Sequence, residues 1–209
     1  MGESRRPAPK IGVDMLYVAK VVKDDETGTE YGAPVRLPGL NNIGYDPATL
    51  SGTYSADDGT YASNTADGAT VITLRVADLL SEHYAMLLGL KQTEKGVVEE
   101  GVDDNPPEMA VGWRSQKSDG TYRFVWALKG KFAKSAETYA TKGGEGITYN
   151  DKELTFTALN RSFDGKKRRQ LDSNDPKLPE GLTLAALSDA ANGWFSDPDY
   201  TPAAPSPGA

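Results

Sequence analysis

Residues 109–132 read MAVGWRSQKSDGTYRFVWALKGKF, two runs of alternating side chains on either side of a polar turn. Asp119 and Gly120 suit that turn, since Gly tolerates a positive φ and Asp can bond its own backbone. Successive side chains of a strand point to opposite faces. One face of the second run therefore carries Tyr122, Phe124, Trp126 and Leu128, and the other carries Arg123, Val125, Ala127 and Lys129. The stretch predicts two long antiparallel strands of a large sheet, with no catalytic pattern.

The composition of the whole chain favours a β protein. A length of 209 residues is enough for one domain with a sizeable core. Its 22 Gly and 13 Pro, spread between short alternating runs, predict many turns. The absence of Cys excludes disulfides and thiol chemistry. The sequence holds no apolar run of about 18 residues, so we expect no membrane insertion, and the first ten residues lack the pattern of a secretory signal.

The charge balance argues mildly against nucleic-acid binding and against an enzyme. The formal net charge is −7, and an acidic surface repels phosphate backbones. A single His is a severe limit on ordinary acid–base catalysis.

The predicted fold is mainly β, a sandwich or barrel-like body with one flanking helix over about residues 78–88 and a short C-terminal helix. Asp78 is the expected N-cap of the first helix, and Gly89 its C-terminal cap. Pro34 should make the strand that returns after residues 11–23 an edge strand or place a bulge in it. Asp164-Gly165 predicts a hairpin turn. The short helix spans about residues 183–191, with Trp194 behind it as an apolar anchor.

Four parts of the chain are expected. Residues 1–10 form a flexible arm, residues 11–196 a single domain, and residues 197–209 a flexible Pro-rich tail. Within the domain, residues 46–68 are polar and almost lack aliphatic side chains. A segment of this length without a core pattern predicts a long loop that orders against a neighbouring subunit.

Three candidate chemical sites have a plainer interpretation, which we favour. His83 could be a general base, but no nucleophile motif accompanies it, and a half-exposed helical His is the simpler interpretation. An acidic cluster could bind a hard cation, but it lacks the spacing of a calcium loop. That cluster is Glu99, Glu100, Asp103 and Asp104, and the same objection applies to Asp57-Asp58-Gly59. We predict no catalytic residue, cofactor or metal site.

The basic run Lys166-Lys167-Arg168-Arg169 has three interpretations. It could contact nucleic-acid phosphates, act as a localisation signal, or meet acidic groups of a partner subunit. Strand alternation would divide the run between two faces, which favours the partner subunit. The glycine-rich residues 143–146 lack the Lys-Ser/Thr of a phosphate loop.

Several segments together resemble the major tail proteins (tail tube proteins) of long-tailed, non-contractile bacteriophages. The resemblance spans about residues 10–195 and rests on the order and spacing of the segments rather than on any one of them. They are residues 11–19 (IGVDMLYVA) with the acidic turn 24–28, 55–59 (SADDG), 76–79 (VADL) with 87–89 (LLG), 103–107 (DDNPP) and 123–132 (RFVWALKGKF).

This resemblance implies a structural, non-enzymatic virion protein. Six subunits would form a ring, and stacked rings would form the tail tube that conducts DNA without sequence-specific binding. It implies further contacts with the tape measure, tail terminator and distal tail proteins, and synthesis in the host cytoplasm. Our candidate subunit-interface residues are Asp46, Leu50, Tyr54, Asp57, Asp58, Tyr61, Lys166, Lys167, Arg168 and Arg169.

Two alternatives stay open at this point. The first is a β-sandwich binding module, a virion decoration or carbohydrate-binding protein that uses Tyr45, Tyr54 and Tyr61. The second is a carboxylate-based hydrolase. We rank it last because no paired acids lie among aromatic side chains on strands.

Overall fold

The structure is a computed structural model that describes residues 6–137, 139, 141 and 150–204. Parts of three predicted segments therefore lie outside it: residues 1–5 of the N-terminal arm, the glycine-rich residues 143–146, and residues 205–209 of the tail. The strands are β1 (Lys10–Asp25), β2 (Gly28–Tyr31), β3 (Val35–Leu37), β4 (Leu40–Ala56), β5 (Gly59–Val76), β6 (Lys91–Gln92), β7 (Val98–Glu99), β8 (Met109–Lys117), β9 (Tyr122–Ala133), β10 (Lys152–Ala158) and β11 (Arg168–Asp172). The helices are α1 (Ser81–Leu88) and α2 (Leu184–Ser188).

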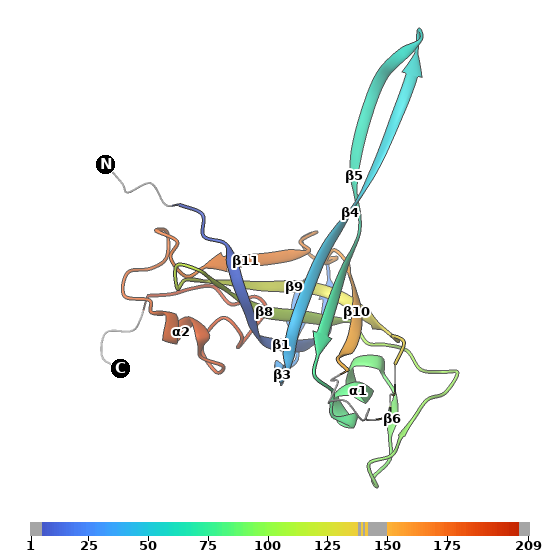
Figure 1. Cartoon of the computed structure of the whole chain (residues 1–209), viewed down its shortest axis with the longest axis vertical. Coiled ribbons are helices and arrows are strands. Elements are labelled where there is room, and N and C mark those ends of the chain that lie inside the picture. Colours follow the sequence, from blue (N-terminus) through green and yellow to red (C-terminus); the bar gives the residue numbers. More distant parts are fainter. Residues whose placement is uncertain (1–5, 138, 140, 142–149, 205–209) are drawn as a thin grey trace.

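The predicted hairpin is the centre of the fold. β8 and β9 pair antiparallel, and Gly120 turns the chain between them with φ of +80°. Within the described residues, nine strands form one sheet in the order β2-β1-β8-β9-β10-β5-β4, with β11 paired to β9 and β3 to β1. The sheet bends so that β4 lies beside β1 without pairing to it (Figure 1). The result is a mainly β, sandwich-like body, as predicted.

Both faces of the β8–β9 hairpin are buried. The face of Phe124, Trp126 and Leu128 packs under the C-terminal segment, against Leu187, Trp194 and Phe195. The opposite face, with Val125 and Ala127, packs inside the sandwich against β5, β10 and α1. Alternation along one strand therefore supplies two separate cores. In Figure 1, α2 lies on one side of β8–β9, and α1 lies at the far end of the body.

Residues 46–68 are not a loop, which corrects the prediction. They continue β4 and β5 into one long antiparallel hairpin, paired from Leu40↔Val76 to Ala56↔Gly59. Small bulges interrupt the register, one of them between Pro47 and Thr49. Because the segment buries no apolar side chains, its sequence lacks the alternation of apolar and polar residues that is typical of a strand. Backbone hydrogen bonds nevertheless extend the two strands, which are already in register.

The first helix is shorter at its start than predicted. It begins at Ser81, and its N-cap position is Leu80, with no side-chain capping bond. Asp78 accepts a hydrogen bond from the backbone N–H of Leu79 instead, so its oxygen caps the turn before the helix. The predicted C-terminal cap is confirmed: Gly89 is left-handed with φ of +67°. A Cβ at Gly89 would lie 2.2 Å from the carbonyl oxygen of Asn105, which requires Gly on steric grounds as well.

The turn at Asp164-Gly165 does not join two paired strands, contrary to the prediction. β10 pairs with residues 130–133 of β9, and β11 pairs with residues 123–127 along the same edge of β9. The turn therefore carries the chain from one half of that edge to the other. The chain around Pro34 forms two separate strands, β2 and β3, which among the described residues pair with β1 alone, so the predicted edge position is confirmed.

Residues 197–200 are held in place, although we predicted a flexible tail from residue 197. Arg161 is only 4 % exposed, and its guanidinium contacts the carboxylates of Asp164 and Asp199 and the hydroxyl of Tyr31. Arg169 donates to the carbonyl oxygens of Pro198 and Tyr200 at 2.8 and 2.9 Å. Charge-assisted bonds of this kind hold residues 197–200, which follow the buried Trp194 and Phe195, against the sheet.

One buried and one partly buried carboxylate make the fold sensitive to acid. Burial would raise the pKa of Asp24, but the Lys129 ammonium at 2.7 Å and the N–H groups of Ser162 and Phe163 lower it from 3.8 to about 2. Hydrogen bonds from Arg123 lower the pKa of Asp172 to about 2 as well, against the effect of burial.

We expect these groups to set the acid unfolding of the protein. In the unfolded chain they take up protons near pH 4, but in the folded chain only near pH 2. Unfolding therefore binds protons below pH 4, and each group's contribution of about 2 kcal/mol is lost as the pH falls from 4 to 2. Urea unfolding between pH 6 and 2.5 measures this. The difference in unfolding free energy between the wild type and Asp24→Asn should shrink on acidification; a constant difference would contradict the assignment.

Candidate subunit interface

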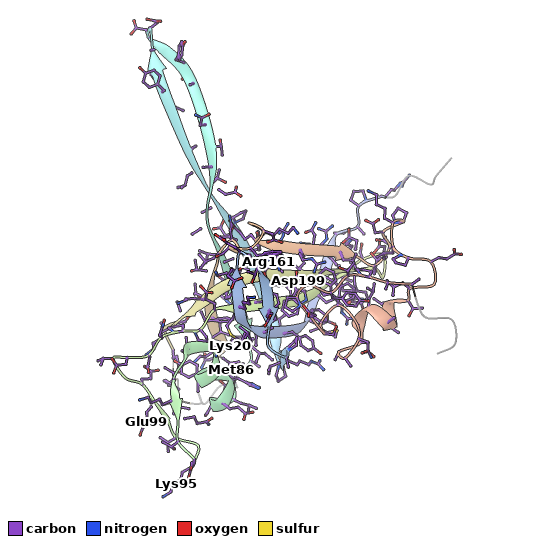
Figure 2. All side chains as sticks on the ribbon, turned by 180° about the vertical axis from the view of Figure 1, so that it is seen from behind. Lys20, Met86, Lys95, Glu99, Arg161 and Asp199 are labelled. Atoms are coloured by element: carbon purple, nitrogen blue, oxygen red, sulfur yellow. The ribbon has the colours of Figure 1, made fainter. Side chains whose placement is uncertain are left out.

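The outer part of the β4–β5 hairpin, residues 46–68, stands away from the body and is called here the distal hairpin (Figures 1 and 2). Every residue from 46 to 67 is exposed except Ala56, which is partly buried. Strands rise about 3.3 Å per residue, so the tip lies roughly 30 Å beyond Pro47. A two-stranded ribbon without a covered face is marginally stable in water. This segment is therefore the part of the described chain that most needs a partner.

Three large apolar side chains lie on the distal hairpin. Tyr54 and Tyr61 are 66 % and 75 % exposed, and their rings meet edge to face with centroids 6.3 Å apart. Leu50 is 63 % exposed. Aromatic side chains supply much of the contact energy of protein interfaces, because they bury a large area with few rotatable bonds. The predicted interface residues Leu50, Tyr54 and Tyr61 are thus placed together on one projecting element.

The tip of the distal hairpin is a two-residue turn formed by Asp57 and Asp58. Both have positive φ, 51° and 59°, a region in which two-residue hairpin turns prefer Asn and Gly. Neither aspartate forms an ion pair among the described residues. The turn therefore presents two carboxylates to solvent at the point farthest from the body.

The side chains of the basic run point to different surroundings, but β11 begins only at Arg168, so strand alternation separates Arg168 from Arg169 and does not apply to Lys166 and Lys167. Arg169 lies against the Trp194 ring and the C-terminal segment. Lys166 pairs with Asp164 at 2.9 Å. Lys167 donates to the carbonyl oxygen of Gly68 and to the Thr70 hydroxyl, and so reaches the base of the distal hairpin. The four side chains do not form one surface for a phosphate backbone.

Arg168 belongs to a hollow of about 600 Å³ between β1, β4 and β11. Its guanidinium stacks over the Tyr45 ring, 4.5 Å from the centroid. Three cationic side chains and no acidic one line the hollow: Lys10, Arg123 and Arg168. The remaining lining is mixed and includes Asn41, Asn42, Trp113, Ser115 and Gln170. We call this feature the basic hollow.

The ten predicted interface residues therefore fall into two groups. Six lie on the distal hairpin, with Asp46 at its base and Asp57 and Asp58 at its tip. Of the basic four, Arg168 alone lines the basic hollow. Sequence reasoning missed Lys10 and Arg123. Their charge was visible, but only the pairing of β1 with β8 and of β11 with β9 places them around one space.

Some residues of the candidate chemical sites lie in ion-pair range of neighbouring side chains. His83 is only 15 % exposed, more buried than predicted, and its Nε2 lies 3.8 Å from Glu82. Glu100 and Asp104 both bind the Lys134 ammonium. Among the described residues, no three His, Asp or Glu side chains are grouped closely enough to hold a metal ion. Nor does any helix in the described part of the chain have the length and hydropathy to cross a membrane.

Tyr45 is separated from the other two tyrosines of the predicted binding surface. It is half-buried beneath Arg168 at the base of β4, whereas Tyr54 lies near the tip. Nine residues of extended strand separate them by about 30 Å. The three rings therefore do not form one platform for a glycan.

Comparison with known proteins identifies the family. No curated protein matches the chain. The family model for phage tail tube proteins matches residues 48–190, which is more than half of the sequence and includes most of the distal hairpin, the β8–β9 hairpin and α2. This match agrees with a mainly β subunit. The chain belongs to the phage tail tube protein family and is a structural protein of the virion tail.

Proposed function

We propose that this protein assembles into hexameric rings that stack into the tail tube, and that the tube conducts the genome during delivery into the host. The distal hairpin is the observation that carries the proposal beyond family membership. It is an ordered ribbon with no core of its own, and its apolar side chains are exposed. A neighbouring subunit would bury those side chains and cover the strand edges that the hairpin leaves open.

The acidic character of the chain suits a conduit for DNA. A formal charge of −7 per subunit gives a tube a negative field, which keeps a phosphate backbone from binding to the wall. On this proposal the DNA slides past the wall without sequence-specific contacts. The tape measure, tail terminator and distal tail proteins would contact the lumen and the two ends of the tube.

Negative-stain electron microscopy of the purified protein tests the proposal. We expect rings or hollow tubes of uniform diameter at micromolar concentration, formed alone or on addition of an initiating tail complex. Analytical ultracentrifugation under the same conditions should show species much larger than the 22.4 kDa monomer. A protein that stays monomeric with the initiating complex present, or that binds glycans as a monomer, would contradict the proposal and favour a binding module.

A further inference from the structure

We propose that the acidic tip of the distal hairpin docks into the basic hollow of a second copy of this chain. The inference rests on the proposed function and specifies which two surfaces meet. The two surfaces lie on different parts of the subunit, so the contact is heterologous. Contacts of this kind form rings where the rotation closes and filaments where it does not.

The negative charge of the tip is not required by the geometry of its turn. Asn-Gly would satisfy the positive φ values at lower conformational cost, yet the chain has Asp57 and Asp58 there. The two adjacent carboxylates repel each other, and no cation among the described residues compensates them. A basic surface on another molecule would supply that compensation.

The basic hollow has the opposite imbalance. Asp172 is already shared by Arg123, at 2.7 Å, and Lys117, at 3.0 Å. Lys10 and Arg168 have no acidic partner in the described part of the chain. Of the three cations that line the hollow, Arg123 is therefore the one with an acidic partner among the described residues, in a protein with a net charge of −7. A volume of about 600 Å³ can hold the two side chains of a hairpin turn.

The geometry requires a second molecule. The tip stands about 30 Å from Pro47, whereas the radius of gyration of a compact chain of this length is about 17 Å. Because the distal hairpin leads away from the body, its tip cannot reach the hollow of its own subunit (Figure 1). It can reach well across a neighbouring subunit. Tyr54 and Tyr61, a few residues behind the tip, would then pack at the rim of the hollow.

A charge exchange tests this pairing. One variant reverses the tip (Asp57→Lys/Asp58→Lys), and another reverses the hollow (Lys10→Glu/Arg168→Glu). Each should raise the critical concentration for tube formation about tenfold or more, because like charges then face each other at the contact. An equimolar mixture of the two variants should restore assembly, since every lysine tip then finds an acidic hollow and every aspartate tip finds a basic one.

Two further variants separate this contact from a general charge effect. Glu94→Lys/Asp103→Lys makes the same change in net charge on exposed acids away from the hairpin, and should assemble like the wild type. Asp57→Asn/Asp58→Gly removes the charge but improves the turn, and should still weaken assembly. Circular dichroism and thermal melts confirm that each variant folds.

The outcomes distinguish this inference from the proposed function. If the wild type forms tubes and the tip variant assembles equally well, the docking inference is wrong and the tube function stands. The same holds if both variants fail alone and their mixture also fails. Tubes that never form from the wild type, even with the initiating complex, would overturn the proposed function itself.

Discussion

Replacing residues 50–66 by Asn-Gly is expected to abolish tube formation and to leave the subunit folded. Thr49 and Asp67 are paired in the hairpin, so a two-residue turn can join them without disturbing the register below. The deletion removes Leu50, Tyr54 and Tyr61 with the tip, but no residue of either core. The melting temperature should therefore stay within a few degrees of the wild-type value, while electron microscopy shows no tubes.

The double variant Tyr54→Ser/Tyr61→Ser is the matched control. This variant retains the length, strand pairing and charge of the distal hairpin and removes the two aromatic rings alone. Buried interface aromatics typically contribute about 2 kcal/mol each, so the two together should raise the critical concentration by about a thousandfold. If the shortened protein formed tubes at the wild-type concentration, the distal hairpin would not be the subunit interface.

Trp126→Ala is expected to have the largest effect on stability. Trp126 is fully buried, packs against the Phe195 ring at 6.0 Å, and donates its indole N–H to the carbonyl oxygen of Trp194 at 2.9 Å. Its ring also fills the space over Gly112, where a Cβ would come within 2.8 Å of it. Truncation leaves a cavity and an unpaired carbonyl, at a cost of about 3–5 kcal/mol.

Urea unfolding measures the cost, with Trp126→Phe as the control. Phenylalanine keeps most of the packing and loses the hydrogen bond, so it should lose about half as much stability or less. A total stability of about 5–15 kcal/mol leaves Trp126→Ala marginally folded. Equal small losses in both variants, below about 1 kcal/mol, would show that the C-terminal segment does not depend on this ring.

The sequence predicted the central hairpin well, because strand alternation and turn chemistry are local. Phe124 and Trp126 could be assigned to one face from their spacing, and Gly120 to the turn because Gly tolerates a positive φ. The distal hairpin was predicted as a loop for a related reason. Burial is what produces a period of two in a sequence, and a ribbon exposed on both faces lacks it.

The tail boundary and the basic hollow needed the tertiary structure. Proline content predicted a flexible end, but the binding of Asp199 by Arg161 depends on a contact between residues 38 positions apart. Lys10 and Arg168 are farther apart in sequence and meet only through the order of the sheet. Contacts of this kind are set by which strands pair, and strand pairing is not a local property of the chain.

The sequence by itself determined that this is a mainly β, acidic protein with a long polar segment that contributes nothing to a core. Those properties follow from composition, alternation and turn residues, which act over a few positions. Only the tertiary structure decided that the segment is a projecting two-stranded hairpin with an acidic tip, and that cations distant in the sequence surround one hollow. Both depend on the register and order of paired strands, because pairing brings together residues that the chain keeps apart.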